Sequence, residues 1–257
     1  KRRSPGKDRF EQLIAANLDT AFTVTSCNAD FNIARIERYV ALALDAGVTP
    51  VILLTKPDLC DDPQPYIDEA KTVSDMVEVV ALNAKSESAF DLLSPWCKAG
   101  QTVAFLGSSG VGKSTLSNAL VGTQDIETGA IREADGKGRH TTTRRQLHFV
   151  PSGCAVLDTP GMRELQLTDA AEGVGDLFND LETLATQCKF RNCAHDSEPG
   201  CAVKAALASG DIDQARVQRW QKLVAEDAFN TASLSERKHK EKNLSKIIKS
   251  LDLKNKK

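Results

Sequence analysis

Two groups of residues in this chain have the types and spacing needed to bind phosphate or a metal ion. The first, here called the phosphate loop, matches the G-x-x-x-x-G-K-[ST] pattern and consists of Gly107, Ser108, Ser109, Gly110, Val111, Gly112, Lys113 and Ser114, followed by Thr115. Its small residues let successive backbone N–H groups surround a phosphate chain, and the next helix adds partial positive charge. Lys113 would reach the outer phosphates and the Ser114 hydroxyl would bind Mg²⁺. The alternative is a glycine-rich turn that only joins a strand to a helix.

The second group lies late in the chain and consists of Cys188, Cys193, His195 and Cys201. Three thiolates and one imidazole are enough for a closed tetrahedral Zn²⁺ site, with no open position for catalysis. We therefore predict one structural zinc ion per chain, which would contribute folding energy to a small helical unit. The alternative is a set of buried free cysteines beside a surface histidine. The remaining cysteines adjoin apolar runs and are predicted to be core residues: Cys27, Cys60, Cys97 and Cys154.

Two short segments that follow apolar runs have residues that can read a purine base. They are Thr55, Lys56, Pro57 and Asp58 in the first, and Asn83, Ala84 and Lys85 in the second. The Asp58 carboxylate can accept hydrogen bonds from guanine N1–H and the exocyclic amine, which adenine does not offer. Lys56 can lay its alkyl stem along the base, and backbone N–H groups of the second segment can approach guanine O6. Taken alone, Lys56-Pro57-Asp58 is a plain turn.

A third segment, Asp158-Thr-Pro-Gly161, ends another predicted strand downstream of the phosphate loop. An aspartate at this position can hold the water shell of Mg²⁺, and the Gly161 backbone N–H can contact a γ-phosphate. In isolation such a sequence is a common turn. Its place after a phosphate loop indicates a nucleotide site.

The pattern of apolar residues predicts an α/β fold that places these segments at strand ends. Strands are predicted at residues 21–25, 49–55, 77–82 and 102–106, and helices at 32–46, 65–74, 89–96 and directly after the phosphate loop. Alternating strands and helices are typical of a doubly wound, mostly parallel sheet. Residues 146–150 and 154–158 predict a strand pair, in which an antiparallel arrangement is one option. Residues 125–139 predict a long mobile loop, and helices dominate from residue 170 onward.

The order of these motifs resembles that of circularly permuted GTPases. The base-reading motif Thr55–Asp58 precedes the phosphate loop, whereas in ordinary GTPases it follows. With the segment Gly138–Thr143, the turn at Asp158–Gly161 and the late cysteine cluster, the chain resembles the ribosome small-subunit-dependent GTPase A family of bacterial 30S assembly factors. The resemblance covers roughly residues 10–225. It implies a GTP hydrolase, binding GTP or GDP with Mg²⁺, that binds the 30S subunit and 16S rRNA and is stimulated by the ribosome.

The resemblance also gives roles to residues near the predicted loop. Met162 stands where many GTPases have the Gln that orients the attacking water. His140 is the candidate replacement, because an imidazole can orient or accept a proton from water near neutral pH. The alternative is a histidine that only packs or is solvated. Thr142, or else Thr141, is expected to close on Mg²⁺ when GTP is bound.

The chain departs from the family in two ways. The family usually has Asn at the position of Thr55, so we expect a weaker contact with guanine N7 and a weaker brace to the phosphate loop. The family also carries an N-terminal OB-fold, and this chain begins about where that module would end.

Composition and charge place limits on the class of protein. The formal net charge is −2, but residues 235–257 hold nine Lys or Arg against three Asp or Glu, which favours an RNA-binding tail or a solvated end. No apolar run approaches the ~18 residues of a membrane span, and the start lacks a signal-peptide core. Seven cysteines, an odd number, argue against a secreted disulfide framework. We expect a soluble, cytoplasmic monomer.

We expect four segments: a basic lead-in at 1–17, the GTPase domain at 18–168, a helical zinc-binding domain at 169–234 and the basic tail at 235–257. Other functions fit parts of the pattern. A permuted GTPase of the large subunit is disfavoured by the cysteine cluster after the GTPase motifs, and a nucleoside kinase or ATPase is disfavoured by Asp58 and the Asp158–Gly161 turn. A nucleotide-regulated RNA-binding module, whose hydrolysis is incidental, remains an alternative.

Overall fold

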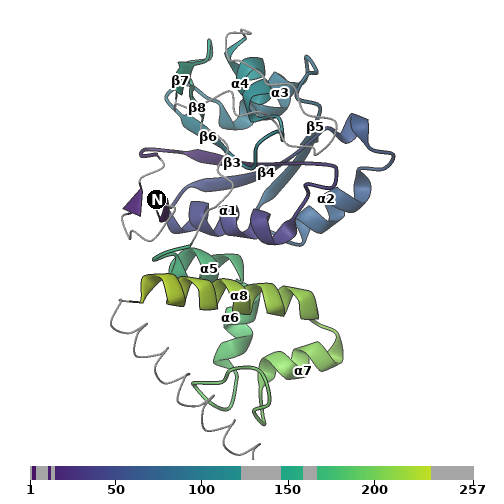
Figure 1. Cartoon of the computed structure of the whole chain (residues 1–257), viewed down its shortest axis with the longest axis vertical. Coiled ribbons are helices and arrows are strands. Elements are labelled where there is room, and N and C mark those ends of the chain that lie inside the picture. Colours follow the sequence, from purple (N-terminus) through teal and green to yellow (C-terminus); the bar gives the residue numbers. More distant parts are fainter. Residues whose placement is uncertain (1, 4–10, 13–14, 123–145, 159–166, 233–257) are drawn as a thin grey trace, which may run out of the picture.

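The computed structural model describes residues 2–3, 11–12, 15–122, 146–158 and 167–232. Within these residues, six strands form one sheet in the order β5-β4-β3-β6-β8-β7 (Figure 1). Their bounds are β3 Thr20–Ser26, β4 Thr49–Thr55, β5 Glu78–Leu82, β6 Thr102–Leu106, β7 Gln146–Phe149 and β8 Ala155–Asp158. A separate antiparallel pair joins β1 Arg2–Arg3 to β2 Glu11–Gln12.

The sheet is parallel except at one edge. β3 pairs in parallel with both β4 and β6, β4 pairs with β5, and β6 pairs with β8. The strands predicted at 21–25, 49–55, 77–82 and 102–106 are thus confirmed, and the pair β7–β8 is antiparallel. In β4 every residue from Pro50 to Thr55 is buried, as expected for a parallel strand covered on both faces.

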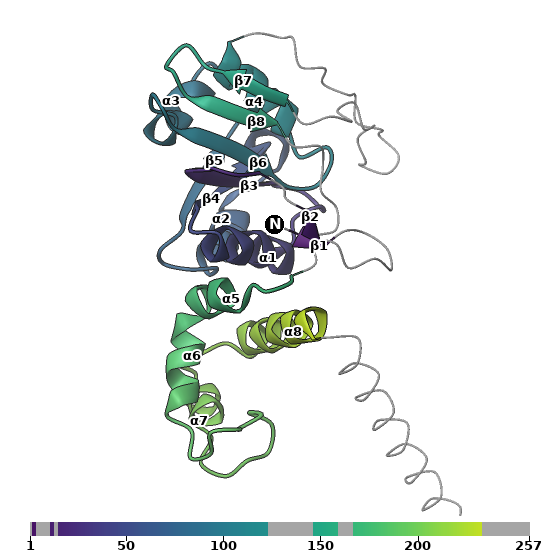
Figure 2. The same cartoon turned by 90° about the vertical axis from the view of Figure 1, so that its left-hand side faces the viewer.

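Helices cover both faces of the sheet (Figures 1 and 2). One face carries α1 Ile33–Asp45 and α2 Gln64–Lys71, and the other carries α3 Ala89–Leu93 and α4 Lys113–Val121. Two short 3₁₀ helices are η1 Pro57–Leu59 and η2 Ser94–Trp96. The helix predicted at 89–96 therefore changes to 3₁₀ geometry at its end, where Pro95 has no backbone N–H to continue the α-helix.

Beyond α1 lies a helical domain of α5 Ala171–Leu177, α6 Asn179–Thr186, α7 Ala202–Ser209 and α8 Gln214–Thr231 (Figure 1). One apolar core runs from the sheet through α1 into this domain and includes Ile52, Val40 and Trp220. Among the predicted core cysteines, Cys27, Cys97 and Cys154 are buried and Cys60 is half-buried. None of the described helices is both long enough and apolar enough to cross a membrane.

A glycine permits the close approach of α5 to α1. A Cβ atom placed on Gly173 would lie 2.1 Å from the carbonyl oxygen of Ala41 and 2.5 Å from the backbone nitrogen of Asp45. Those distances are far below van der Waals contact, so any side chain at Gly173 would push the two helices apart. The contact between the α/β domain and the helical domain therefore depends on the missing side chain.

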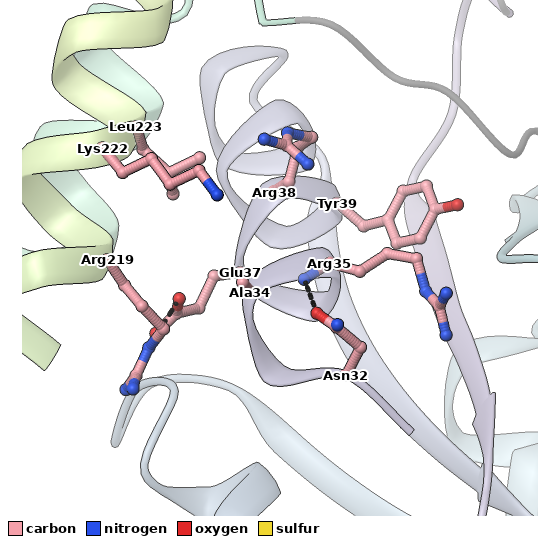
Figure 3. A pocket seen from close by; sticks show the side chains of 9 residues that line it. All are labelled: Asn32, Ala34, Arg35, Glu37, Arg38, Tyr39, Arg219, Lys222 and Leu223. Carbon is pink, nitrogen blue, oxygen red and sulfur yellow. Dashed lines mark hydrogen bonds and ion pairs between the residues drawn. The ribbon is translucent and has the colours of Figure 1, made fainter. Parts of the chain in front are cut away.

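Two ion pairs join α1 to α8. Glu37 is fully buried, and both its carboxylate oxygens accept from Nε of Arg219, at 2.8 and 3.0 Å. Arg38 donates to Oε2 of Glu226 at 2.5 Å. A pocket of about 290 Å³, here called the interdomain pocket, lies between the two helices (Figure 3). The polar contacts thus hold the helices together around a space that is not filled by side chains.

The role of Gly173 can be tested with a neighbour on the same helix. We expect Gly173→Ala to lower the free energy of unfolding by about 1–3 kcal/mol or more, because the added methyl group overpacks the α1–α5 contact. Gly175→Ala is the control: its Cβ would meet nothing within 4 Å, so the change should be neutral or stabilise the helix by about 0.5–1 kcal/mol. Urea unfolding measures both. Equal stability of Gly173→Ala and the unsubstituted protein would contradict this account.

Candidate functional site

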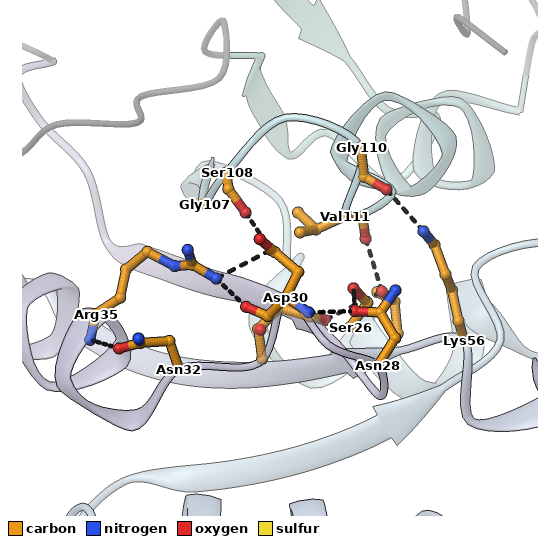
Figure 4. Close-up of polar contacts among 12 residues, drawn as sticks. Ser26, Asn28, Asp30, Asn32, Arg35, Lys56, Gly107, Ser108, Gly110 and Val111 are labelled. Carbon is orange, nitrogen blue, oxygen red and sulfur yellow. Dashed lines mark hydrogen bonds and ion pairs between the residues drawn. The ribbon is translucent and has the colours of Figure 1, made fainter. Parts of the chain in front are cut away.

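The phosphate loop connects β6 to α4 in the predicted strand–loop–helix arrangement (Figure 4). Gly107 has a φ of +152°, and a Cβ there would lie 2.2 Å from the carbonyl oxygen of Val24, so no other residue fits. The Lys113 side chain is buried and folds back into the loop. Its Nζ donates to the carbonyl oxygens of Gly107 at 3.0 Å and Ser108 at 2.5 Å. The amino group is therefore held within the loop.

The loop lies at the topological switch point of the sheet. β3 has β4 on one side, and its other neighbour, β6, comes from later in the chain. In doubly wound sheets, ligands bind outside the carboxyl ends of the strands where the order reverses in this way. The phosphate loop follows β6 and the loop of residues 27–32 follows β3, so both border that crevice.

Thr55 and Lys56, at the end of β4, are hydrogen-bonded to the phosphate loop. The Thr55 Oγ1 lies 2.6 Å from the carbonyl oxygen of Val111 and 3.0 Å from that of Thr25. The single hydroxyl hydrogen can be donated to one of these carbonyl oxygens at a time, and the shorter distance favours Val111. Thr55 therefore braces the phosphate loop through its hydroxyl, and the weaker brace expected relative to Asn stays a prediction. Lys56 Nζ donates to the carbonyl oxygen of Gly110 at 2.8 Å.

The environment of Lys56 is unusual for a lysine. Its backbone is left-handed, with a φ of +60°, which turns the side chain toward the phosphate loop. Burial lowers the pKa of its amino group. The nearby Lys85 charge acts in the same direction, while the Asp30 carboxylate partly offsets both. These interactions place a desolvated cation where the edge of a nucleotide is expected.

The other base-reading candidates leave neighbouring strands at the same edge. Thr55 pairs with Leu82 across β4 and β5, so the segments after these two strands emerge next to each other. Asp58 lies in η1, directly after Pro57, and is exposed. In the segment Asn83–Lys85, the Asn83 Oδ1 accepts from the Lys85 backbone N–H at 2.9 Å, and Ala84 is buried. The topology thus brings both segments to the switch-point edge.

The phosphate loop has a further contact, with Asp30, that was not predicted from the sequence. Asp30, four residues after β3, accepts a hydrogen bond from Ser108 Oγ at 2.6 Å and one from Arg35 Nη2 at 2.9 Å, both at its Oδ2 (Figure 4). Arg35 also donates to the Asp30 carbonyl oxygen. The polar residues Asn28, Asp30 and Asn32, which follow a buried strand, were a signal that could have indicated Asp30, because polar groups after a parallel strand lie at the same edge of the sheet as Thr55.

Several of the predicted site residues lie partly or wholly outside the described residues. Asp158 ends β8, beside β6, but its side chain is outside the described residues. Gly161, His140 and Thr142 also lie outside the described residues, so their predicted roles stay predictions. Ser114 and Thr115 are half-buried in the first turn of α4.

The predicted metal ligands come together in the helical domain. The ligand atoms of Cys188, Cys193, His195 and Cys201 all lie within 4.8 Å of one another. His195 Nδ1 is 3.6 Å from the Cys188 sulfur and 3.4 Å from the Cys201 sulfur, and the two sulfurs are 3.9 Å apart. Zn²⁺ bond lengths of about 2.3 Å to sulfur and 2.0–2.1 Å to nitrogen require ligand separations of about 3.5–3.8 Å. The cluster therefore fits a tetrahedral metal ion, and zinc stays the prediction.

Neighbouring elements hold the cluster in place. The N-terminus of α7 donates to two of the sulfurs, from Ala202 N to Cys188 at 3.3 Å and from Lys204 N to Cys201 at 3.4 Å. Burial raises the pKa of the Cys188 thiol, but N–H donation from Ala202 and Val203 brings it below its ordinary value, which favours the thiolate that metals bind. The Trp220 ring of α8 lies 5.3 Å from the His195 ring.

Metal removal tests this site. We expect the purified protein to contain one equivalent of zinc, and the Cys201→Ser variant to lose it. The melting temperature of that variant should be lower, because zinc binding contributes about 10–16 kcal/mol of folding energy in small zinc peptides. Cys60→Ser, a half-buried thiol outside the cluster, is the control and should retain the metal. A chromogenic chelator and circular dichroism measure both effects. A protein that is metal-free yet fully folded would contradict the assignment.

The Thr55 brace is tested by two substitutions, one that removes the hydroxyl and one that keeps it. Thr55→Val replaces the hydroxyl with a methyl group and leaves the buried Val111 carbonyl without this donor, which should lower the free energy of unfolding by about 1–3 kcal/mol. We expect roughly ten-fold weaker guanine nucleotide binding, measured with a fluorescent GDP analogue, and a lower melting temperature. Thr55→Ser keeps the hydroxyl and should bind normally. If Thr55→Val bound nucleotide as tightly as Thr55→Ser, the brace would have no role in the site.

Comparisons with known proteins agree with this geometry. The RsgA GTPase family model matches residues 2–168. An ABC transporter model matches residues 91–256, a stretch that contains the same phosphate loop. The chain is 48% identical over 250 residues to the "Small ribosomal subunit biogenesis GTPase RsgA 2" of Vibrio parahaemolyticus, covering 97% of this chain and 70% of that protein.

Solved structures give the same answer for the fold. The crystal structure of YjeQ from Thermotoga maritima matches with a TM-score of 0.61 at 28% identity, covering 82% of this chain and 71% of that one. YloQ, described as a circularly permuted GTPase, matches with a TM-score of 0.59 at 25% identity, covering 84% and 70%. Sequence and fold thus agree that this chain is a circularly permuted GTP hydrolase belonging to the RsgA GTPase family.

Proposed function

We propose that this chain binds GTP at the carboxyl edge of its sheet and hydrolyses it on the small (30S) ribosomal subunit, assisting late assembly of that subunit in the cytoplasm. The observation that carries the nucleotide site is the pair of hydrogen bonds from Thr55 and Lys56 to the phosphate loop. They join a base-reading segment and a phosphate-binding segment that are more than fifty residues apart in the chain. The name of the Vibrio parahaemolyticus relative supports the ribosomal role.

Each predicted residue has a distinct task in binding the nucleotide. Asp58 accepts from the guanine edge, and the Asn83–Lys85 backbone approaches guanine O6. The N–H groups of the phosphate loop and the amino group of Lys113 hold the phosphates. Ser114, Thr142 and the Asp158 carboxylate are the groups that would hold Mg²⁺ and its water. When bound, Mg²⁺ neutralises charge on the β- and γ-phosphate oxygens.

Hydrolysis requires a group that orients water, and His140 is the proposed one. Met162 cannot orient water, so intrinsic turnover should be slow. Contact with the ribosome would bring His140 to the γ-phosphate, which makes binding and hydrolysis depend on each other. Gly161 would contact the γ-phosphate through its backbone N–H.

The helical domain would contribute to recognition of 16S rRNA. A Zn²⁺ ion held by Cys188, Cys193, His195 and Cys201 would fix the loops around α7. Lys189 and Lys204 lie beside the cluster in sequence and are exposed, so they can neutralise phosphates of the RNA backbone.

Nucleotide hydrolysis with and without isolated 30S subunits tests the proposal. We expect hydrolysis of GTP but not ATP, and a higher rate with 30S subunits. His140→Ala should lower the stimulated rate by about 10²-fold, as for loss of a group that transfers or orients a proton, without weakening GTP binding. His239→Ala, outside the predicted loop, is the control.

Three outcomes would contradict parts of the proposal. Unchanged stimulated turnover in His140→Ala would exclude His140. Equal use of ATP would exclude base reading by Asp58. Retained rRNA affinity without any stimulation of hydrolysis would favour a nucleotide-regulated RNA-binding module.

A further inference from the structure

Basic residues outnumber acidic ones in the described lining of the interdomain pocket between α1 and α8 (Figure 3). The basic residues are Arg35 and Arg38 from α1, and Arg219 and Lys222 from α8, and Glu37 is the acidic one among the described lining residues. The Arg35 guanidinium is paired with Asp30, beside the phosphate loop. Because the basic groups come from both domains, an anion in the pocket would contact the GTPase domain and the helical domain at once.

The ion pairs around the pocket leave hydrogen-bond donors for a ligand. Arg219 is paired with Glu37 through its Nε, and Arg38 with Glu226 through one terminal nitrogen. A guanidinium carries five N–H donors, so each of these pairs uses only a part of its arginine. The side chains of Arg38 and Arg219 are 25% and 19% exposed, which keeps them accessible from solvent.

Lys222 differs from the arginines. It is exposed on α8 and forms no ion pair with any carboxylate in the part of the chain that the structure describes. It lines the same pocket as Arg38, whose guanidinium is partly neutralised by Glu226. Like charges that share a small pocket repel each other, and a bound anion would remove that repulsion.

We propose that the interdomain pocket binds a backbone phosphate of ribosomal RNA, with Lys222 and Arg38 as its principal contacts. This inference rests on the proposed function, since it assigns part of the RNA contact to this surface. The planar guanidinium of arginine matches the arrangement of two phosphate oxygens, and the ammonium group of lysine adds a compact charge beside it. The volume of about 290 Å³ is larger than a phosphate group needs.

The charge of the neighbouring sequence favours a long polyanion such as RNA. Lys222 is exposed, so the pocket can be reached from solvent at this residue. Residues 235–257, which follow α8 in sequence, hold nine Lys or Arg against three Asp or Glu. A polyanion that reaches the pocket could therefore continue to a further basic segment. Counterion release from each neutralised phosphate would supply the binding free energy.

Three substitutions that each lower the charge by one test this site. Lys222→Gln removes a cation from α8, and Ala34→Glu adds a carboxylate to the α1 side of the pocket. Val224→Glu adds a carboxylate to an exposed position of α8 that does not line the pocket, and is the matched control. The affinity of the full chain for 30S subunits and for protein-free 16S rRNA is measured over a series of salt concentrations.

We expect Lys222→Gln and Ala34→Glu to bind both RNA probes several-fold more weakly at low salt. The slope of log affinity against log salt should become shallower by about 0.7–0.9, the contribution of one phosphate contact. Val224→Glu should keep the slope of the unsubstituted chain, and basal GTP hydrolysis should be unchanged in Lys222→Gln. Inorganic phosphate is the second probe, and its binding is measured as a shift in the melting temperature of the protein.

The outcomes separate this inference from the proposed function. Unchanged affinity and slope in Lys222→Gln, with normal 30S binding, would overturn the pocket assignment alone. Weaker binding to 30S subunits but not to protein-free rRNA would mean that the pocket contacts a ribosomal protein. A phosphate-induced thermal shift that Lys222→Gln abolishes, with RNA binding intact, would mean a small-anion site. An unsubstituted chain that binds neither 30S subunits nor rRNA would contradict the inference and the proposed function together.

Discussion

Parallel pairing of β3 with both β4 and β6 determines where the described parts of the proposed nucleotide site lie. Since the strands run in one direction, the residues that follow them emerge along a single edge of the sheet. Asp30 follows β3, Thr55 ends β4 and the phosphate loop follows β6. The permuted order of the motifs changes the path of the chain but not this arrangement in space. Thr55 and Lys56 therefore contact the phosphate loop although they precede it in sequence.

The helix α1 is the element that the two domains share. It packs on the sheet with one side and receives α5 and α8 on the other (Figure 1). Burial raises the pKa of Glu37, and the hydrogen bond and charge of Arg219 lower it again without restoring its ordinary value. A buried ion pair of this kind contributes little net stability, because desolvation offsets its attraction. The Glu37–Arg219 pair instead orients the two helices, because it sets the position of α8 along α1.

The same helix connects the phosphate loop to the helical domain through short contacts. Arg35 holds Asp30, which accepts a hydrogen bond from Ser108 of the loop, and Arg35 also lines the interdomain pocket. Arg38 and Glu37, on the next turn, are paired with α8. The cluster of Cys188, Cys193, His195 and Cys201 belongs to the same domain, and the Trp220 ring of α8 lies beside His195. Polar contacts thus set how α8 is positioned relative to α1 and the phosphate loop. Apolar packing alone would allow more than one such position.

The local features of this protein could be predicted from short stretches of its chain. The phosphate loop, the cysteine cluster and the strand-forming runs are short patterns, whose chemistry depends on neighbours in the chain. The distant residues that support these features were identified only from the folded chain. The Thr55–Val111 and Asp30–Ser108 hydrogen bonds join residues 56 and 78 positions apart, and the closeness of Gly173 to Ala41 depends on how two helices cross. Such contacts follow from strand order, register and helix packing, which no single segment encodes, so a carboxylate like Asp30 acquires its role only when the sheet has formed.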